Sequence, residues 1–272
     1  ARESAALRDI ARQLSGARDA AVMLGTLDSL IQRHPHKLAG RRGVRQLRRR
    51  LQAEHERTQQ LTLSAPSARA EVLGSLHAFR WRVAAWNLTD SPGIELVDTD
   101  LELLYRNGRR RHRRVVRRKG NRLIAFHQWR KRVKDLRYAA EMLDHRSAGG
   151  STRASASRGS SKRSRAGKRA SDSSRRLRRL AGRADELGEL LGEEHDLAIF
   201  AERLRARGQR EDQQTWRTGR RTREQLLKII AKRRRVLRKR ALRRGKRLYR
   251  ERPSRFMRRV RSAHASGAQQ PS

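Results

Sequence analysis

The sequence predicts an all-α protein, and three observations support that fold class. Apolar residues recur at spacings of three and four in almost every segment, which is the periodicity of a helix with one buried face. No segment alternates apolar and polar residues as a half-buried strand does. Hydrophobic residues make up 35% of the chain, so the core has to be built from helices with narrow apolar stripes.

Helices are expected in this order along the first part of the chain. Leu7 and Ile10 mark a short first helix, and Asp19 resembles the N-cap of a second. After Pro35, a basic helix is predicted over about 37–63, and another follows over 68–89. The last of these directs its large apolar residues inward: Leu73, Leu76, Phe79, Val83 and Trp86.

The second part predicts five further helices, after a turn at "TDSPG" (89–93). Their expected ranges are about 94–118, 121–145, 175–190, 195–207 and 214–250. Asp196 resembles an N-cap in the same way as Asp19.

Residues 146–174 differ from the rest of the chain because they contain no large apolar side chain. Serine, glycine, alanine and cations dominate, so burial cannot offset the entropy of ordering, and a disordered insertion is predicted. The expected organisation is a first helical half at 1–93, a second at 94–261 that contains the insertion, and a tail at 262–272.

The charge of the chain restricts its partners. Lys and Arg number 70 against 27 Asp and Glu, which gives a formal net charge of +43. A chain this basic repels itself unless an anion neutralises it, so nucleic acid, an acidic membrane or a free polyanion are the candidate partners. No apolar run reaches the length of a membrane span, and a cytoplasmic location is expected.

The segment "AFHQWRKRVKDLRYAAEML" (125–143) concentrates basic groups on one side of a predicted helix. An apolar stripe follows Phe126, Trp129, Val133, Leu136, Ala140 and Leu143. The other side carries a ladder of His127, Arg130, Lys131, Lys134, Arg137 and Tyr138, with Glu141 placed to pair with Arg137. A ladder with steps of one or two helical turns suits an extended chain of phosphates, and the alternative is a solvated basic face.

Two segments align without a gap at an offset of 177 residues. "LSGARDAAVMLGTL" (14–27) matches "LGEEHDLAIFAERL" (191–204), so that Arg18 meets His195 and Asp19 meets Asp196. The match favours an internal duplication, although two amphipathic helices can also align by chance. In the second half the basic helix precedes this segment, so the chain is expected to lack the equivalent first helix of its first half.

These motifs resemble those of the CHAD family, the conserved histidine α-helical domain. "FHQWRKRVKDLRYAAEML" resembles its signature helix, "LLGEEHDLAIFAERL" its second motif, and "RRRVLRKRALRRGKRLYRERPSRFMRRV" (233–260) its C-terminal helix. The resemblance implies two pseudo-symmetric four-helix bundles around a basic groove or pore, with the first bundle incomplete here. It also implies non-catalytic binding of inorganic polyphosphate, with association to polyphosphate granules.

The resemblance implies a set of phosphate-binding residues. From the signature helix these are His127, Arg130, Lys131, Lys134, Arg137 and Tyr138. The other motifs add Arg18, His195, Arg234, Arg235 and Arg238.

Two other classes of function were weighed against this one. An associated hydrolase of triphosphates would need a Glu-x-Glu-x-Lys strand, which the sequence lacks, so no catalysis is expected. The alternative is an RNA- or DNA-binding basic protein, which charge alone supports equally. Aromatic content is 4% and no base-reading motif is present, so nucleic acid is expected as a non-specific competitor.

Overall fold

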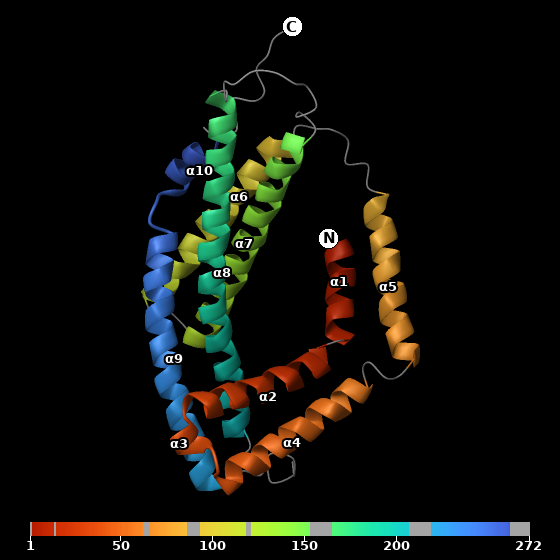
Figure 1. Ribbon diagram of the computed structural model, residues 1–272, viewed down its shortest axis with the longest axis vertical. Coiled ribbons are helices and arrows are strands. Elements are labelled where there is room, and N and C mark those ends of the chain that lie inside the picture. Colours follow the sequence, from red (N-terminus) through yellow and green to blue (C-terminus); the bar gives the residue numbers. More distant parts are fainter. Residues whose placement is uncertain are drawn as a thin grey trace. The chain divides into compact units, whose positions relative to one another are not determined.

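The computed structural model describes an all-α protein (Figure 1). The residues it describes are 2–13, 15–61, 66–85, 93–117, 121–152, 165–206 and 219–261. All secondary structure in these ranges is helical, which confirms the predicted fold class. The chain divides into two compact units, at residues 1–89 with 196–233 and at 90–195 with 234–272.

The first unit contains five helices of its own. They are α1 (Arg2–Gln13), α2 (Ser15–Arg33), α3 (Pro35–Leu38), α4 (Arg42–Gln59) and α5 (Pro66–Ala84). Helix α2 packs against α4, and α1 packs against α5, where Arg82 pairs with Glu3 at 3.0 Å. The C-terminal part of α8 (Arg165–Ala206) and the N-terminal part of α9 (Arg220–Leu248) complete the unit.

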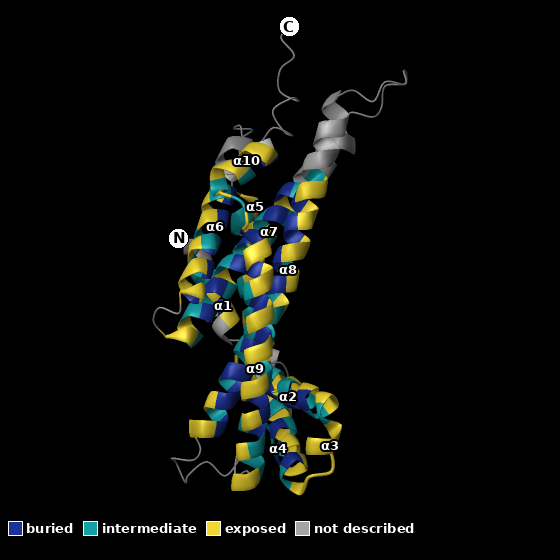
Figure 2. Cartoon of the chain, turned by 90° about the vertical axis from the view of Figure 1, so that its left-hand side faces the viewer, coloured by how far each residue is buried: buried dark blue, intermediate teal, exposed yellow. Residues whose placement is uncertain are grey.

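The second unit is built on α6 (Gly93–Val116) and α7 (Arg122–Thr152), which lie side by side (Figure 1). The remaining parts of α8 and α9 join them, and α10 (Pro253–Arg261) packs on α6. One continuous hydrophobic core runs through these elements, from Leu101 on α6 to Val260 on α10. In Figure 2 the buried residues form stripes along the helices, as the apolar spacing in the sequence requires.

Local sequence explains where several helices begin. Pro35, Pro66 and Pro253 each stand at the first position of a helix, where the missing N–H costs nothing. Asn121 caps α7, because its side-chain oxygen accepts hydrogen bonds from the backbone N–H groups of Leu123 and Ile124. Gly40 has a φ of 77°, which lets the chain reverse between α3 and α4.

Three predictions about helix ends are wrong, namely two N-caps and one helix break. Asp19 and Asp196 do not cap helices but lie within α2 and α8, and α8 is continuous where a break near 190–195 was predicted. Residues 146–152 and 165–174 of the predicted insertion continue α7 and α8, and the disorder predicted for 146–174 stays a prediction. Three predicted segments lie outside the described residues: part of the insertion (153–164), the tail (262–272) and most of the turn (89–92).

The predicted halves also differ from the observed units. The division passes through α8 at 195/196 and through α9 at 233/234, so each of these long helices serves both units. A single cut at residue 93, inferred from turn residues, could not reveal this, because a helix shared between two cores has no break in its apolar pattern.

Helix α5 is less buried than its sequence predicts. Leu73 and Leu76 are exposed and Trp81 is 76% exposed, while Phe79 and Val83 are half-buried. The apolar residues of α5 are spread around the helix, and its partner α1 is short, so one neighbour cannot cover them all. Trp86 lies outside the described residues.

Candidate anion-binding site

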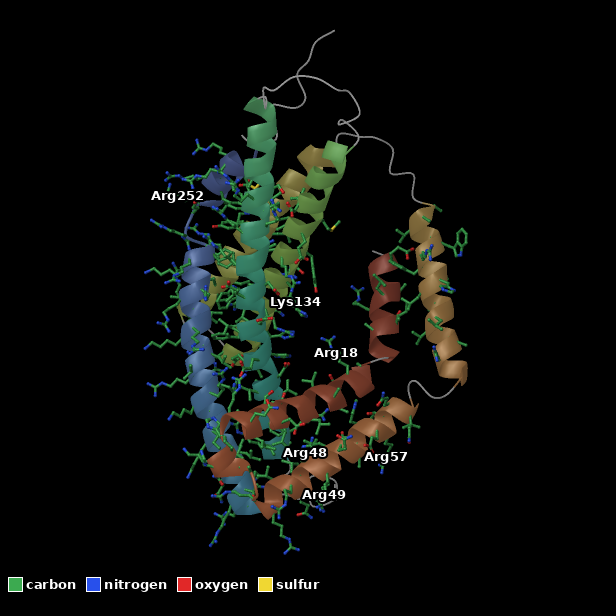
Figure 3. All side chains as sticks on the ribbon, viewed as in Figure 1. Arg18, Arg48, Arg49, Arg57, Lys134 and Arg252 are labelled. Atoms are coloured by element: carbon green, nitrogen blue, oxygen red, sulfur yellow. The ribbon has the colours of Figure 1, made fainter. Side chains whose placement is uncertain are left out.

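Helix α7 separates its two faces as predicted. Phe126, Trp129, Val133, Leu136, Ala140 and Leu143 are all buried in the core of the second unit. On the other side His127, Arg130, Lys134 and Arg137 are half-buried, while Lys131 and Tyr138 are exposed. The packed stripe therefore fixes the rod that carries the basic groups (Figure 3, which labels Lys134).

Two histidines meet at the start of the ladder. The ring of His127 on α7 lies 4.7 Å from that of His195 on α8, with 35° between the ring planes. Burial lowers the pKa of His127 below its ordinary value of 6.5, and the charges of His195, Lys131 and Arg130 lower it further. Among the described residues, the Nδ1 atom of His127 is buried with no hydrogen-bond partner.

Arg130 lies one helical turn beyond His127 and against a glycine of α8. Its Nε and one terminal nitrogen are each 3.7 Å from the point where a side chain at Gly192 would begin. The Nε atom is buried, and no described residue accepts its hydrogen. A desolvated guanidinium N–H without an acceptor costs free energy, and a bound anion would recover that cost.

Glu194 fixes two arginines of α9 beside these groups. Its Oε1 atom accepts hydrogen bonds from Arg234, at 3.0 Å and 2.8 Å, and from Arg238 at 2.8 Å. The carboxylate side chain is 1% exposed and the arginines are 14% and 22% exposed. The guanidinium of Arg238 also lies 5.4 Å from the ring centroid of Phe126, a cation–π distance.

Glu194 is a site residue that was not predicted, although its position in the sequence is unusual for a carboxylate. Glu194 follows Leu191 by three residues and precedes Ala198 by four, so it occupies the apolar stripe of α8. A carboxylate on a buried stripe needs a cationic partner. Only the fold reveals that two arginines some 40 residues later supply it.

Arg137, at the far end of the ladder, is neutralised by the chain itself. It pairs with Glu141 at 2.7 Å, as predicted, and also with Asp185 of α8. The hydrogen bond to Glu141 raises the pKa of Arg137; burial opposes this, and the charges of Asp185 and Glu141 add to the rise. The neutralised end of the ladder is thus Arg137, and the candidate site lies at its other end, from His127 to Lys131, about 6 Å along the helix.

Arg235 does not join this group, and Arg18 belongs to the other unit. Arg235 is exposed and lies one residue, or about 100° around α9, from Arg234. Arg18 is exposed on α2 in the first unit, whereas all the other groups belong to the second. The assembled site therefore comprises His127, Arg130, His195, Glu194, Arg234 and Arg238, from three helices of one unit.

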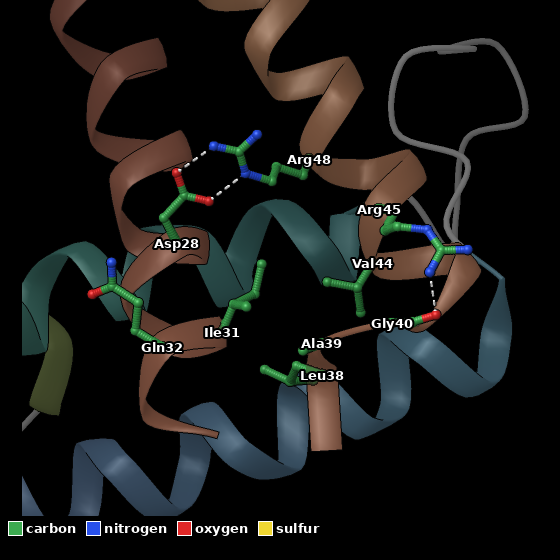
Figure 4. Close-up of a pocket in the computed structure, with 9 residues that line it drawn as sticks. All are labelled: Asp28, Ile31, Gln32, Leu38, Ala39, Gly40, Val44, Arg45 and Arg48. Carbon is green, nitrogen blue, oxygen red and sulfur yellow. Dashed lines mark hydrogen bonds and ion pairs between the residues drawn. The ribbon is translucent and has the colours of Figure 1, made fainter. Parts of the chain in front are cut away.

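The first unit has a separate pocket of about 360 Å³ at the turn between α3 and α4 (Figure 4). Arg48 is held there by Asp28 at 2.7 Å and 3.1 Å, and Arg45 donates to the carbonyl of Gly40. Both cations already have acceptors from the chain. The pocket thus offers no comparable group of unsatisfied donors.

None of the described helices is long and apolar enough to cross a membrane. No group of three or more His, Asp or Glu in the described ranges is arranged to hold a metal ion.

Comparison with known proteins identifies one family. The family model named CHAD domain matches residues 1–158, more than half of the chain. This range ends just after α7, so it contains the His127 ladder but not the motifs at 191–204 and 233–260. No curated protein and no solved structure matches the chain.

Proposed function

The chain belongs to the CHAD family, and from that membership together with the site on α7 we propose that it binds inorganic polyphosphate. The observation that carries this proposal is the pair of buried nitrogens on α7 without a partner among the described residues: Nδ1 of His127, which donates in one tautomer and in the imidazolium, and Nε of Arg130. They lie on a rigid helix, and guanidinium groups accommodate phosphate oxygens better than other side chains do.

The charge of the site supports an anionic ligand. Arg234 and Arg238 share the single carboxylate of Glu194, and Arg130 lies against Gly192 of the same helix, so three guanidinium groups stand against one carboxylate. Partial burial lowers the local dielectric, which strengthens attraction to an anion relative to a fully solvated basic face. A polymer suits this arrangement better than a single phosphate, because further phosphates can reach Lys131 and Lys134 as tethered ligands.

The proposal includes no catalysis. The basic face of α7 offers hydrogen-bond donors, and the carboxylates near it are committed to arginines: Glu194 to Arg234 and Arg238, and Glu141 and Asp185 to Arg137. Phosphoryl transfer commonly uses carboxylates to hold a metal ion, and these three are occupied in another way. We therefore expect no release of phosphate from polyphosphate by the purified chain.

A matched pair of variants tests the site. Arg130→Gln removes an unsatisfied cation and should weaken binding of long-chain polyphosphate about 10- to 100-fold, the equivalent of one charged hydrogen bond. Arg137→Gln removes the same charge from the same helix, but at a neutralised position, and should change the affinity less than about threefold. Titration by fluorescence anisotropy at physiological salt measures both, with circular dichroism to show unchanged helicity.

Equal losses in the two variants would mean that total charge, rather than this site, determines binding.

We also propose that the chain associates with polyphosphate granules. A tagged chain should then co-localise with granules in cells, and Arg130→Gln should disperse it while Arg137→Gln does not.

A further inference from the structure

A second basic surface lies on the solvent side of α6 and α9 in the second unit. Arg106, Arg110, Arg113 and Arg117 recur at spacings of four, three and four, so they form one row along α6 and just past its end. Arg235, Lys239, Arg243 and Lys246 form a second row along α9. All eight side chains are exposed, and we call them the α6/α9 surface. None of them belongs to the site on α7.

The two rows border the same contact between helices. Arg109 of α6 donates to the carbonyl of Tyr249 at 3.2 Å, and Arg106 and Arg113 stand one turn before and after it. His112 of α6 lies 3.4 Å from the carbonyl of Leu242 of α9.

Lys239 and Lys246 stand one turn before and after Leu242. The two helices run antiparallel, because Tyr105 contacts the carbonyl of Leu248 and His112 that of Leu242. Around each helix the order of faces is core, neighbouring helix, basic row, so in an antiparallel pair both rows lie on the same outer side. Figure 2 shows exposed residues along both helices, and Figure 3 shows nitrogen-tipped side chains projecting along α9.

The α6/α9 surface carries uncompensated charge. No hydrogen bond or ion pair joins these eight side chains to any residue that the structure describes. The chain contains no acidic residue between Glu224 and Glu251, so α9 cannot neutralise its own row. Other arginines of α9 are neutralised, unlike those of the row: Arg234 and Arg238 pair with Glu194, and Arg244 pairs with Glu186.

We propose that the α6/α9 surface binds the sugar–phosphate backbone of double-stranded nucleic acid. Each row is about 16 Å long, which faces several phosphates at 3.4 Å of axis per strand. Axes of packed helices lie about 8–10 Å apart and long side chains spread further, so the separation of the rows approaches the ~12 Å width of a major groove. Each row can then meet one of the two backbones.

Other partners of this surface are less well suited. The eight side chains include no aromatic residue, so single-stranded nucleic acid has no platform for stacking its bases. An anionic membrane usually requires large apolar side chains beside the cations, and neither row contains one. Arginine and lysine directed at phosphates read no bases, so binding should be independent of sequence.

Salt dependence provides the test. The full chain is titrated with a fluorescent duplex of about 20 base pairs at several salt concentrations. The slope of log K against log salt is negative, and each lost phosphate contact lowers its magnitude by ~0.9. The variant replaces Arg106, Arg110, Lys239 and Lys246 with Gln and should lower that magnitude by about 3 to 4. A charge-matched control replaces Arg41, Arg42, Arg49 and Arg57 with Gln, all exposed residues at α4 (Figure 3 labels the last two). The control should change the slope by less than about 1.

Polyphosphate binding separates this proposal from the previous one. The α6/α9 variant should keep its polyphosphate affinity within about threefold, and Arg130→Gln should leave duplex binding unchanged. Equal slope changes in the α6/α9 variant and the α4 control would overturn the duplex proposal. So would a variant that loses binding to vesicles containing phosphatidylserine but keeps the duplex. Neither result bears on Arg130, so polyphosphate binding could fail or stand independently.

Discussion

The two faces of α7 differ in how their side chains are contacted. On the core face the packing is so close that only a glycine fits opposite Trp129: Gly245 of α9 lies against its ring. On the basic face His127 and Arg130 each keep a buried nitrogen without a partner among the described residues. The difference indicates that the tight face holds the helix in place, so that the other face can present unsatisfied groups without collapsing.

The largest effect should come from disturbing the tight face. A Cβ atom at residue 245 would lie 2.5 Å from Trp129 and 2.7 Å from His112, so Gly245→Ala must displace both rings. We expect a loss of about 3 kcal/mol in the free energy of unfolding, because the core is overpacked. Gly182→Ala is the control, since that glycine is exposed in α8 with no atom within 4 Å. It should stabilise the chain by up to about 1 kcal/mol through helix propensity. Denaturant unfolding measures both, and similar values would refute the packing argument.

The contrast also marks what could be predicted from sequence. The core stripe of α7 and the pairing of Arg137 with Glu141 follow from helical periodicity alone, and both are confirmed. Helix α5 was predicted less well, because burial of Leu73 and Leu76 depends on a neighbour that periodicity does not identify. The continuity of α8 was not predicted because Asp196 resembled an N-cap. In the structure Asp196 lies inside the helix.

The repeat inferred from the sequence agrees with burial at several aligned positions. Met23 and Phe200 are both buried, as are Leu27 and Leu204, and Val22 and Ile199 are both half-buried. The duplication itself remains a prediction. The candidate site was partly predictable for a similar reason: residues on one helix share a face by spacing, whereas Glu194 with Arg234 and Arg238 depends on tertiary contact.

A smaller effect should come from substituting Glu194, which is buried like a core residue but is paired with cations of the site. Glu194→Ala leaves two partly buried arginines without an acceptor and should cost about 2 kcal/mol of stability. Polyphosphate affinity should fall as well, despite the gain in net positive charge, because Arg234 and Arg238 lose their orientation.

Glu194→Gln distinguishes orientation from charge. The amide oxygen still accepts hydrogen bonds while the negative charge is lost, so polyphosphate affinity should rise above that of the unmodified chain. Glu186→Gln is the matched control, since Glu186 pairs with Arg244 at the surface with its side chain 55% exposed. Tighter binding in Glu194→Ala would show that Glu194 acts only by charge.

The smallest effect should be the pH dependence of the two faces. Burial lowers the pKa of two histidines below the ordinary value of 6.5: His112 of α6, which packs against Trp129 on the core face, and His127 on the basic face. Between that value and the lowered ones, the unfolded chain binds more protons than the folded chain, so stability falls as the pH falls through about 6.5. The faces should respond differently to polyphosphate, because a bound anion favours the imidazolium of His127 but cannot reach His112, which is 8% exposed.

Polyphosphate affinity should therefore rise as the pH falls from about 7.5 to 6, and His127→Gln should remove part of that rise. His127 is the group of the site whose pKa burial lowers, so the substitution tests that imidazole. Titration at several pH values measures the effect, with His36→Gln, an exposed histidine of the first unit, as the control. A pH profile unaltered by His127→Gln would contradict the idea that this imidazole contacts the ligand. The loss of affinity expected for Arg130→Gln would still stand, because a guanidinium does not titrate near neutral pH.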